Sequence, residues 1–110
     1  MEYFEFVETP VFSKQRSELI DDDDYQKFQD FLLKSHEDGD TISKTGGCKK
    51  IRWGLENKGK RGGVRIIYYT LTAKGKIYLL LMYSKNRKDD LSEKEKAILN
   101  QISKQLNGPQ

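Results

Sequence analysis

Three basic side chains, Lys50, Arg52 and Arg65, stand in apolar sequence surroundings and are candidates for chemistry on a phosphate. Side chains two apart in a strand share one face, so Lys50 and Arg52 would point one way, and Ile51 and Trp53 the other. Arg65 lies in a run of branched and aromatic residues, where a charge is costly unless it faces a solvent-open cleft or a phosphate. If the two strands pair, the three cations converge on one surface.

A cationic surface without metal ligands suits RNA, because RNA carries its own nucleophile, the 2′-hydroxyl. A protein can cleave RNA by aligning that hydroxyl and by stabilising the charge that builds up on the phosphate, which fixed Arg and Lys side chains do. Proton transfer also needs a base and an acid, for which Tyr83 or a Lys of lowered pKa are the available candidates. Tyr83 ends an apolar run, and Lys85 follows it. The alternative is that these cations only hold phosphates.

The positive charge of the chain is concentrated in one segment. The formal net charge is +3, yet residues 44–65 carry eight basic residues and one acidic residue, while the remainder of the chain is net negative. A polyanion site needs such segregation, since neutralising phosphates releases condensed counterions; the alternative is a solvated basic loop. The residues predicted to contact RNA phosphates are Lys44, Lys49, Lys58, Lys60, Arg61, Arg87 and Lys88.

The N-terminal half of the chain predicts one strand followed by a helical hairpin. Residues 3–8 alternate aromatic or apolar with acidic side chains, which is typical of a half-buried strand. Thr9 and Pro10 suit the N-cap and first position of a helix that runs to about Leu19. The acidic run 21–24 suits the positive end of a second helix better than a metal site, because four consecutive Asp side chains point in different directions. His36 is expected on the surface near the end of that helix.

The C-terminal half predicts three strands and a last helix. The strands are residues 48–53, 64–71 and 77–83, and the helix begins at the capping box of residues 92–95. The order is therefore β-α-α-β-β-β-α, which predicts an α+β fold with a small antiparallel sheet and helices on one face. The other face would be left open to a ligand.

Length and composition exclude several classes of function. The 110 residues fit a single domain, 1–110. The longest apolar run is far below the roughly 20 residues of a membrane span, and the N-terminus lacks the features of a secretory signal, so a cytoplasmic location is expected. One Cys, Cys48, and one His offer no zinc set, so no metal or cofactor is expected. In the Walker-like stretch 54–61, Arg61 replaces the hydroxyl that binds magnesium, which argues against nucleoside triphosphate binding.

Three segments in a fixed order carry a resemblance to a known family. They are Gly47–Arg52, which contains K-x-R, Gly63–Tyr69, which contains G-x-R-I-I-Y, and Leu80–Asn86, which contains Y-x-K. Over most of its length the chain resembles the RelE/HigB toxins, closest to the HigB-2 type. The resemblance implies a RelE-like fold and a bacterial type II toxin that cleaves mRNA in the ribosomal decoding site without metal. It also implies a cognate HigA-like, helix-turn-helix antitoxin that holds the toxin inactive.

The resemblance also assigns roles to individual residues. Lys50, Arg52 and Arg65 match the family's cationic active-site positions, and Lys85 matches the Lys that follows the last strand. Their implied roles are phosphate positioning and stabilisation of charge in the transition state. ParE-like toxins share the fold but act on DNA gyrase, so gyrase inhibition and RNA binding without cleavage are the alternatives.

The chain departs from the family where some members place a Tyr or His as the acid or base. Here the segment reads Asp89-Asp90-Leu91. Tyr83, close to Lys85, is the expected substitute, and Lys50 is the alternative base.

Overall fold

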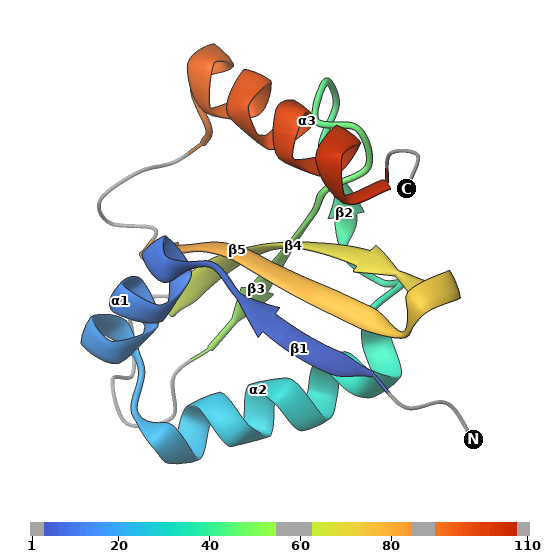
Figure 1. The fold of residues 1–110 in the computed structure, drawn as a ribbon. Coiled ribbons are helices and arrows are strands. Elements are labelled where there is room, and N and C mark those ends of the chain that lie inside the picture. Colours follow the sequence, from blue (N-terminus) through green and yellow to red (C-terminus); the bar gives the residue numbers. More distant parts are fainter. Residues whose placement is uncertain (1–3, 55–62, 85–89, 108–110) are drawn as a thin grey trace.

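The computed structural model describes residues 4–54, 63–84 and 90–107, where strands form one sheet flanked by helices (Figure 1). The strand order across the sheet is β1-β5-β4-β3-β2. None of the helices in these residues is long and apolar enough to cross a membrane. In chain order the elements are β1 (Glu5–Glu8), α1 (Pro10–Leu19), α2 (Asp22–Ser35), β2 (Asp40–Thr41), β3 (Lys49–Trp53), β4 (Val64–Leu71), a 3-10 turn (Thr72–Lys74), β5 (Lys76–Ser84) and α3 (Glu93–Asn107).

The predicted α+β class is confirmed, and the predicted order of elements holds with one strand added. That strand, β2, has two residues, which is too short for alternation to show in a sequence. Strands β2 to β5 pair antiparallel with their neighbours, whereas β1 runs parallel to β5, so the sheet is mixed. The parallel pair is possible because two helices and the other strands separate β1 from β5 along the chain.

Helices cover both faces of the sheet, which corrects the prediction of one covered and one open face (Figure 1). One core includes Phe12 of α1 and Phe28 of α2, and the other includes Leu99 of α3. The reason lies in β4, where residues 64–69 are all buried, so that both alternating sets of side chains need cover. Solvent still reaches the α3 face at Lys50, which is half-buried, and at Arg52, which is exposed.

Side-chain caps begin both N-terminal helices, as the sequence predicts. The Thr9 hydroxyl oxygen accepts a hydrogen bond of 3.0 Å from the Phe12 N–H at the start of α1. The Asp21 carboxylate accepts one of 2.8 Å from the Asp24 N–H at the start of α2. The acidic run therefore acts as a cap, and no cluster of three His, Cys, Asp or Glu residues suited to a metal occurs in the described part of the chain.

Helix α3 is fixed at its start and along its length. The predicted capping box is confirmed, since the Ser92 N–H donates to Glu95 Oε1 at 2.8 Å and the Glu95 N–H donates to Ser92 Oγ at 3.1 Å. Further along, Ser103 Oγ donates to the Thr45 carbonyl oxygen at 2.8 Å. A Cβ on the neighbouring Gly46, whose φ is +77°, would lie 2.2 Å from Ser103 Oγ. These contacts hold α3 against the connection between β2 and β3.

The expectation that His36 lies on the surface is wrong. The residue is 9% exposed, and its ring packs at a tilt of 58° against Phe4, with the ring centroids 4.8 Å apart. The His36 carbonyl oxygen accepts a hydrogen bond of 2.8 Å from the buried Tyr68 hydroxyl. This hydrogen bond holds the end of α2 against the sheet. Tyr68 is 32 residues away in the sequence, so the residue pattern of α2 alone does not predict the contact.

Candidate active site

Strand register brings three of the predicted site residues into one row across the sheet. Arg52 of β3 lies opposite Arg65 of β4, and Arg65 lies opposite Tyr83 of β5. Residues directly opposite each other on antiparallel strands share a face. Tyr83 belongs to the core on which α3 packs, so the row lies on the α3 face of the sheet.

Arg65 is the buried centre of this row. Its side chain is 8% exposed, and Nη1 has no hydrogen-bond partner among the described residues. A buried cation without an acceptor costs stability, and the like charge of Arg52 directly opposite adds to that cost. An anion placed between the two guanidinium groups would offset both costs, which makes this position a candidate phosphate site.

Lys50 lies two residues before Arg52 on β3 and on the same face, while Ile51 and Trp53 pack into the opposite core, as predicted. The Lys50 side chain is 30% exposed, and its Nζ lies 3.9 Å from Asp90 Oδ1. Lys50 therefore lies beside this row, two residues along β3 from Arg52, with part of its side chain exposed to solvent. The structure thus places Lys50, Arg52 and Arg65 on one face, whereas their roles in chemistry stay predictions.

Tyr83 closes the row beside Arg65. Burial raises the pKa of the Tyr83 phenol, as do the charges of Asp90 and Glu95, while Arg65 acts in the opposite direction. A raised pKa keeps the phenol protonated at neutral pH, so Tyr83 can donate a proton but is a poor base. If Tyr83 takes part in proton transfer, its raised pKa favours the acid over the base, and that role stays a prediction.

Asp90 lies beside this site, although the sequence motif gave it no role. Its Oδ1 accepts a hydrogen bond of 2.8 Å from the Leu91 N–H, and this bond, followed by the charges of Lys50 and Lys96, lowers the pKa of Asp90. The carboxylate is therefore ionised at neutral pH. The only hint in the sequence is an acidic pair, 89–90, directly after the basic residues 87–88.

The other predicted cations lie apart from the row or outside the described residues. Lys44 Nζ lies 3.4 Å from the Glu93 carboxylate. Lys49 Nζ donates to Thr41 Oγ1 at 3.3 Å, and alternation along β3 places Lys49 on the face opposite to Lys50. Lys49 therefore lies on the other face from the candidate phosphate site, and Lys44 pairs with Glu93 at the start of α3. Lys58, Lys60, Arg61, Lys85, Arg87 and Lys88 lie outside the residues that the structure describes.

Cys48 is a structural residue of the α3-side core, as the sequence suggests. Its side chain is fully buried, and burial raises the pKa of the thiol. Its Sγ also lies 3.6 Å from the Thr45 carbonyl oxygen. The thiol is therefore no nucleophile for this site.

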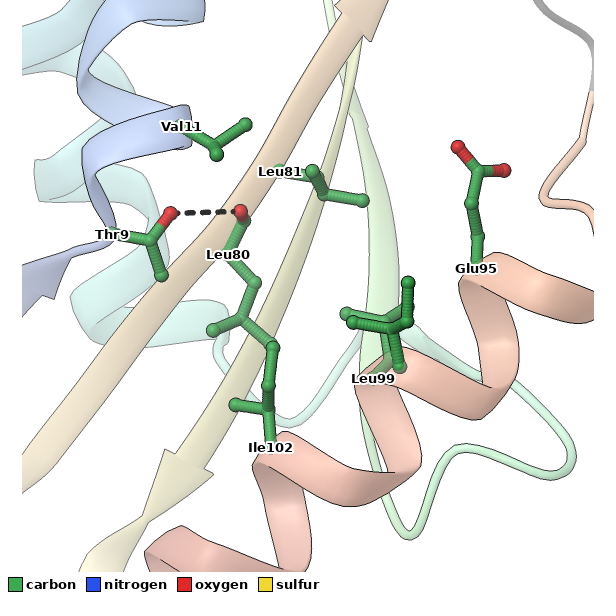
Figure 2. Close-up of a pocket in the computed structure, with 8 residues that line it drawn as sticks. Thr9, Val11, Leu80, Leu81, Glu95, Leu99 and Ile102 are labelled. Carbon is green, nitrogen blue, oxygen red and sulfur yellow. Dashed lines mark hydrogen bonds between the residues drawn. The ribbon is translucent and has the colours of Figure 1, made fainter.

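An apolar groove of about 190 Å³ lies between the start of α1, β5 and α3 (Figure 2). At its edge the Thr9 hydroxyl donates to the Leu80 carbonyl oxygen at 3.0 Å. The β4–β5 register shifts here and leaves Leu80 without a partner on β4, and the pairing of β1 with β5 ends at Leu79. Among its lining residues only Glu95 is charged, and its sign is negative. The groove is therefore unsuited to a phosphate.

One comparison with known protein families bears on this site. The family model described as the RelE toxin of the RelE / RelB toxin-antitoxin system matches residues 8–109. The matched segment begins at the end of β1 and contains all of the predicted site residues. It also covers nearly the whole chain of 110 residues. The chain belongs to the RelE toxin family of toxin-antitoxin systems.

Proposed function

We propose that this toxin is a ribosome-dependent, metal-independent endoribonuclease that cleaves mRNA and so inhibits translation. The observation that carries the proposal is Arg65, whose buried guanidinium has an Nη1 without a partner in the described residues. It lies directly between Arg52 and Tyr83 on the sheet. A buried cation without an acceptor lowers the stability of the fold, so its presence points to a ligand of opposite charge. The proposed ligand is an RNA phosphate.

In the proposed reaction the 2′-hydroxyl oxygen attacks the adjacent phosphorus, and the bond from phosphorus to the 5′-oxygen breaks. The 2′-hydroxyl gives its proton to solvent water, the leaving 5′-oxygen gains one from a general acid, and solvent returns a proton to that acid after the reaction. Arg65 and Arg52 stabilise the charge that builds up on the phosphate oxygens. Tyr83, held protonated by its raised pKa, donates the proton to the 5′-oxygen. The products are a 2′,3′-cyclic phosphate and a 5′-hydroxyl end.

Lys50 serves as a further phosphate-binding cation in this proposal. Its Nζ lies 3.9 Å from Asp90 Oδ1 on the face that carries Arg52 and Arg65, where it can also contact a phosphate oxygen. Lys85 is proposed as a cation of the same site. The remaining cations of the basic segment and of residues 87–88 are proposed to hold RNA phosphates at the periphery, where loss of one contact weakens binding without stopping the reaction.

The partner in this proposal is a cognate antitoxin. A toxin of this family belongs to a toxin-antitoxin system, so a second protein restrains it. We propose that this protein is HigA-like with a helix-turn-helix domain, that the toxin is of the HigB-2 type, and that both act in the cytoplasm, where ribosomes translate mRNA. A neighbouring small open reading frame that encodes a helix-turn-helix protein would support the assignment.

Primer extension on a translated mRNA tests the proposal. Purified toxin added to active ribosomes should produce cuts at defined codon positions, and the same mRNA without ribosomes should stay intact. Arg65→Ala should fold and give no cuts. Absence of codon-associated cuts with the wild-type protein would contradict ribosome-dependent cleavage. Inhibition of supercoiling in a gyrase assay run in parallel would instead favour the ParE-like alternative.

A further inference from the structure

We propose that Asp90 is a positioning residue that holds the Lys50 ammonium at the candidate phosphate site. This inference rests on the proposed function, because it assigns a role within the same reaction. Asp90 lies in the segment that leads into α3, and Lys50 lies on β3, so the contact of 3.9 Å joins two separate parts of the fold.

The Asp90 side chain is 68% exposed, and its carboxylate is held by two contacts. Its Oδ1 accepts the Leu91 N–H at 2.8 Å, and the same oxygen faces Lys50 Nζ. The Leu91 side chain is 5% exposed and lies in the core that includes Tyr83 and Leu99. Burial of Leu91 therefore fixes the backbone that carries Asp90, and the position of the carboxylate follows from packing under α3.

Lys50 needs such a partner more than an arginine would. A lysine ends in a compact charge on a flexible four-carbon stem, so it keeps one position only when another group holds it. Arg52 and Arg65 on the same face repel the ammonium. Asp90 offsets this repulsion, and at 3.9 Å it leaves ammonium N–H donors available to a phosphate oxygen.

The neighbouring acid on α3 does not provide the same contact. Glu93 lies 3.4 Å from Lys44 Nζ and 3.6 Å from Lys96 Nζ. Within the described residues, Asp90 is the carboxylate that pairs with Lys50. Glu93 therefore offers a matched control, because Glu93→Gln removes one negative charge three residues away and leaves the Lys50 contact intact.

The first test separates positioning from general charge. Single-turnover cleavage of ribosome-bound mRNA is measured for the wild type, Asp90→Asn, Asp90→Glu and Glu93→Gln, each first checked for folding by circular dichroism. Asp90→Asn should lower the maximal rate by about 10-fold to 100-fold with little change in the toxin concentration for half-maximal rate. Asp90→Glu should recover part of that rate, and Glu93→Gln should match the wild type. Equal rates for Asp90→Asn and Glu93→Gln, or a loss that appears only as weaker binding, would overturn the inference.

The second test needs no cleavage activity. The Asp90 carboxyl is titrated by carbon-detected NMR in the wild type and in Lys50→Met. Loss of the Lys50 charge should raise the pKa of Asp90 part of the way to its ordinary value, because the Leu91 N–H bond remains. An unchanged pKa would show that the two groups do not pair and would overturn the inference. If the wild type cleaves no mRNA while this pKa does shift, the proposed nuclease function fails and the Asp90–Lys50 contact stands.

Discussion

Arg52 and Arg65 lie directly opposite each other on β3 and β4, so two guanidinium groups share one face of the sheet at neighbouring positions. Like charges in this relation destabilise a sheet. Arg65 is also buried, and its Nη1 lacks an acceptor in the described residues. The pair therefore lowers the stability of the free protein, and binding of an anion would offset this loss.

Arg65→Met should separate stability from function. A methionine fills a similar space without the uncompensated charge, so the free energy of unfolding should rise by about 1 kcal/mol while mRNA cleavage is lost. Urea denaturation and primer extension measure the two effects on the same preparation. A fall in stability would mean that Arg65 serves the fold, and full cleavage would remove it from the site.

Arg16→Met supplies the matched control on another part of the molecule. Arg16 lies 4.2 Å from the centre of the Tyr25 ring and 3.1 Å from the Asp22 carboxylate. Its replacement should lower stability by roughly 1 kcal/mol and leave cleavage unchanged. The two arginines should thus change stability in opposite directions, which distinguishes a cation placed for a ligand from one placed for packing.

The sheet and the cationic row could be predicted because both depend on alternation within strands. Because side chains alternate along a strand, Lys50 and Arg52 are predicted on one face and Ile51 on the other. The structure shows Ile51 packed against the opposite core. Two apolar sets alternating in residues 64–69 also contained the signal that both faces are covered. The prediction of an open face failed because it placed all helices on one face, whereas α3 covers the face opposite to α1 and α2.

Contacts between distant segments were beyond the reach of the sequence. The burial of His36 depends on Tyr68, and the Lys50–Asp90 pair joins β3 to a residue just before α3. Neither has a periodic pattern. The preference for Tyr83 as an acid over a base also depends on burial and on neighbouring charges, which raise its pKa. The residue types suggest which chemistry is possible, whereas the packing around a side chain decides the direction of its pKa shift.

Tyr83→Phe should slow cleavage by at least about 100-fold in single turnover, because the phenol is the proposed proton donor. Its pKa is raised above the ordinary value of about 10, so the wild-type rate should show no loss from Tyr83 ionisation below that pH. Tyr78→Phe on the same strand is the control and should retain the wild-type rate. An unchanged rate for Tyr83→Phe would exclude proton donation by this residue.

Alkaline pH should destabilise the fold through Tyr68. Burial is the main cause that raises the pKa of Tyr68 to about 12, above its ordinary value of about 10. The folded state then holds the proton more tightly than the unfolded state, so this stabilisation is complete below about pH 10 and is lost as the pH rises towards 12. Urea denaturation at pH 9 and at pH 11 measures the loss. Tyr68→Phe should start less stable, without its hydrogen bond to His36, and should lose less stability over this interval; an equal loss would refute the assignment.

The nucleophile can be tested on the RNA. Removal of the 2′-hydroxyl at the nucleotide before the scissile phosphate should abolish cleavage at that codon, because the proposed attack has no other oxygen to use. Cuts at other codons of the same mRNA should continue, which controls for toxin and ribosome activity. The products at unmodified sites should carry 2′,3′-cyclic phosphate ends, detectable by mass spectrometry. Equal cleavage at the deoxy position would require water as the nucleophile, and the roles given to Arg65, Arg52 and Tyr83 would then lose their basis.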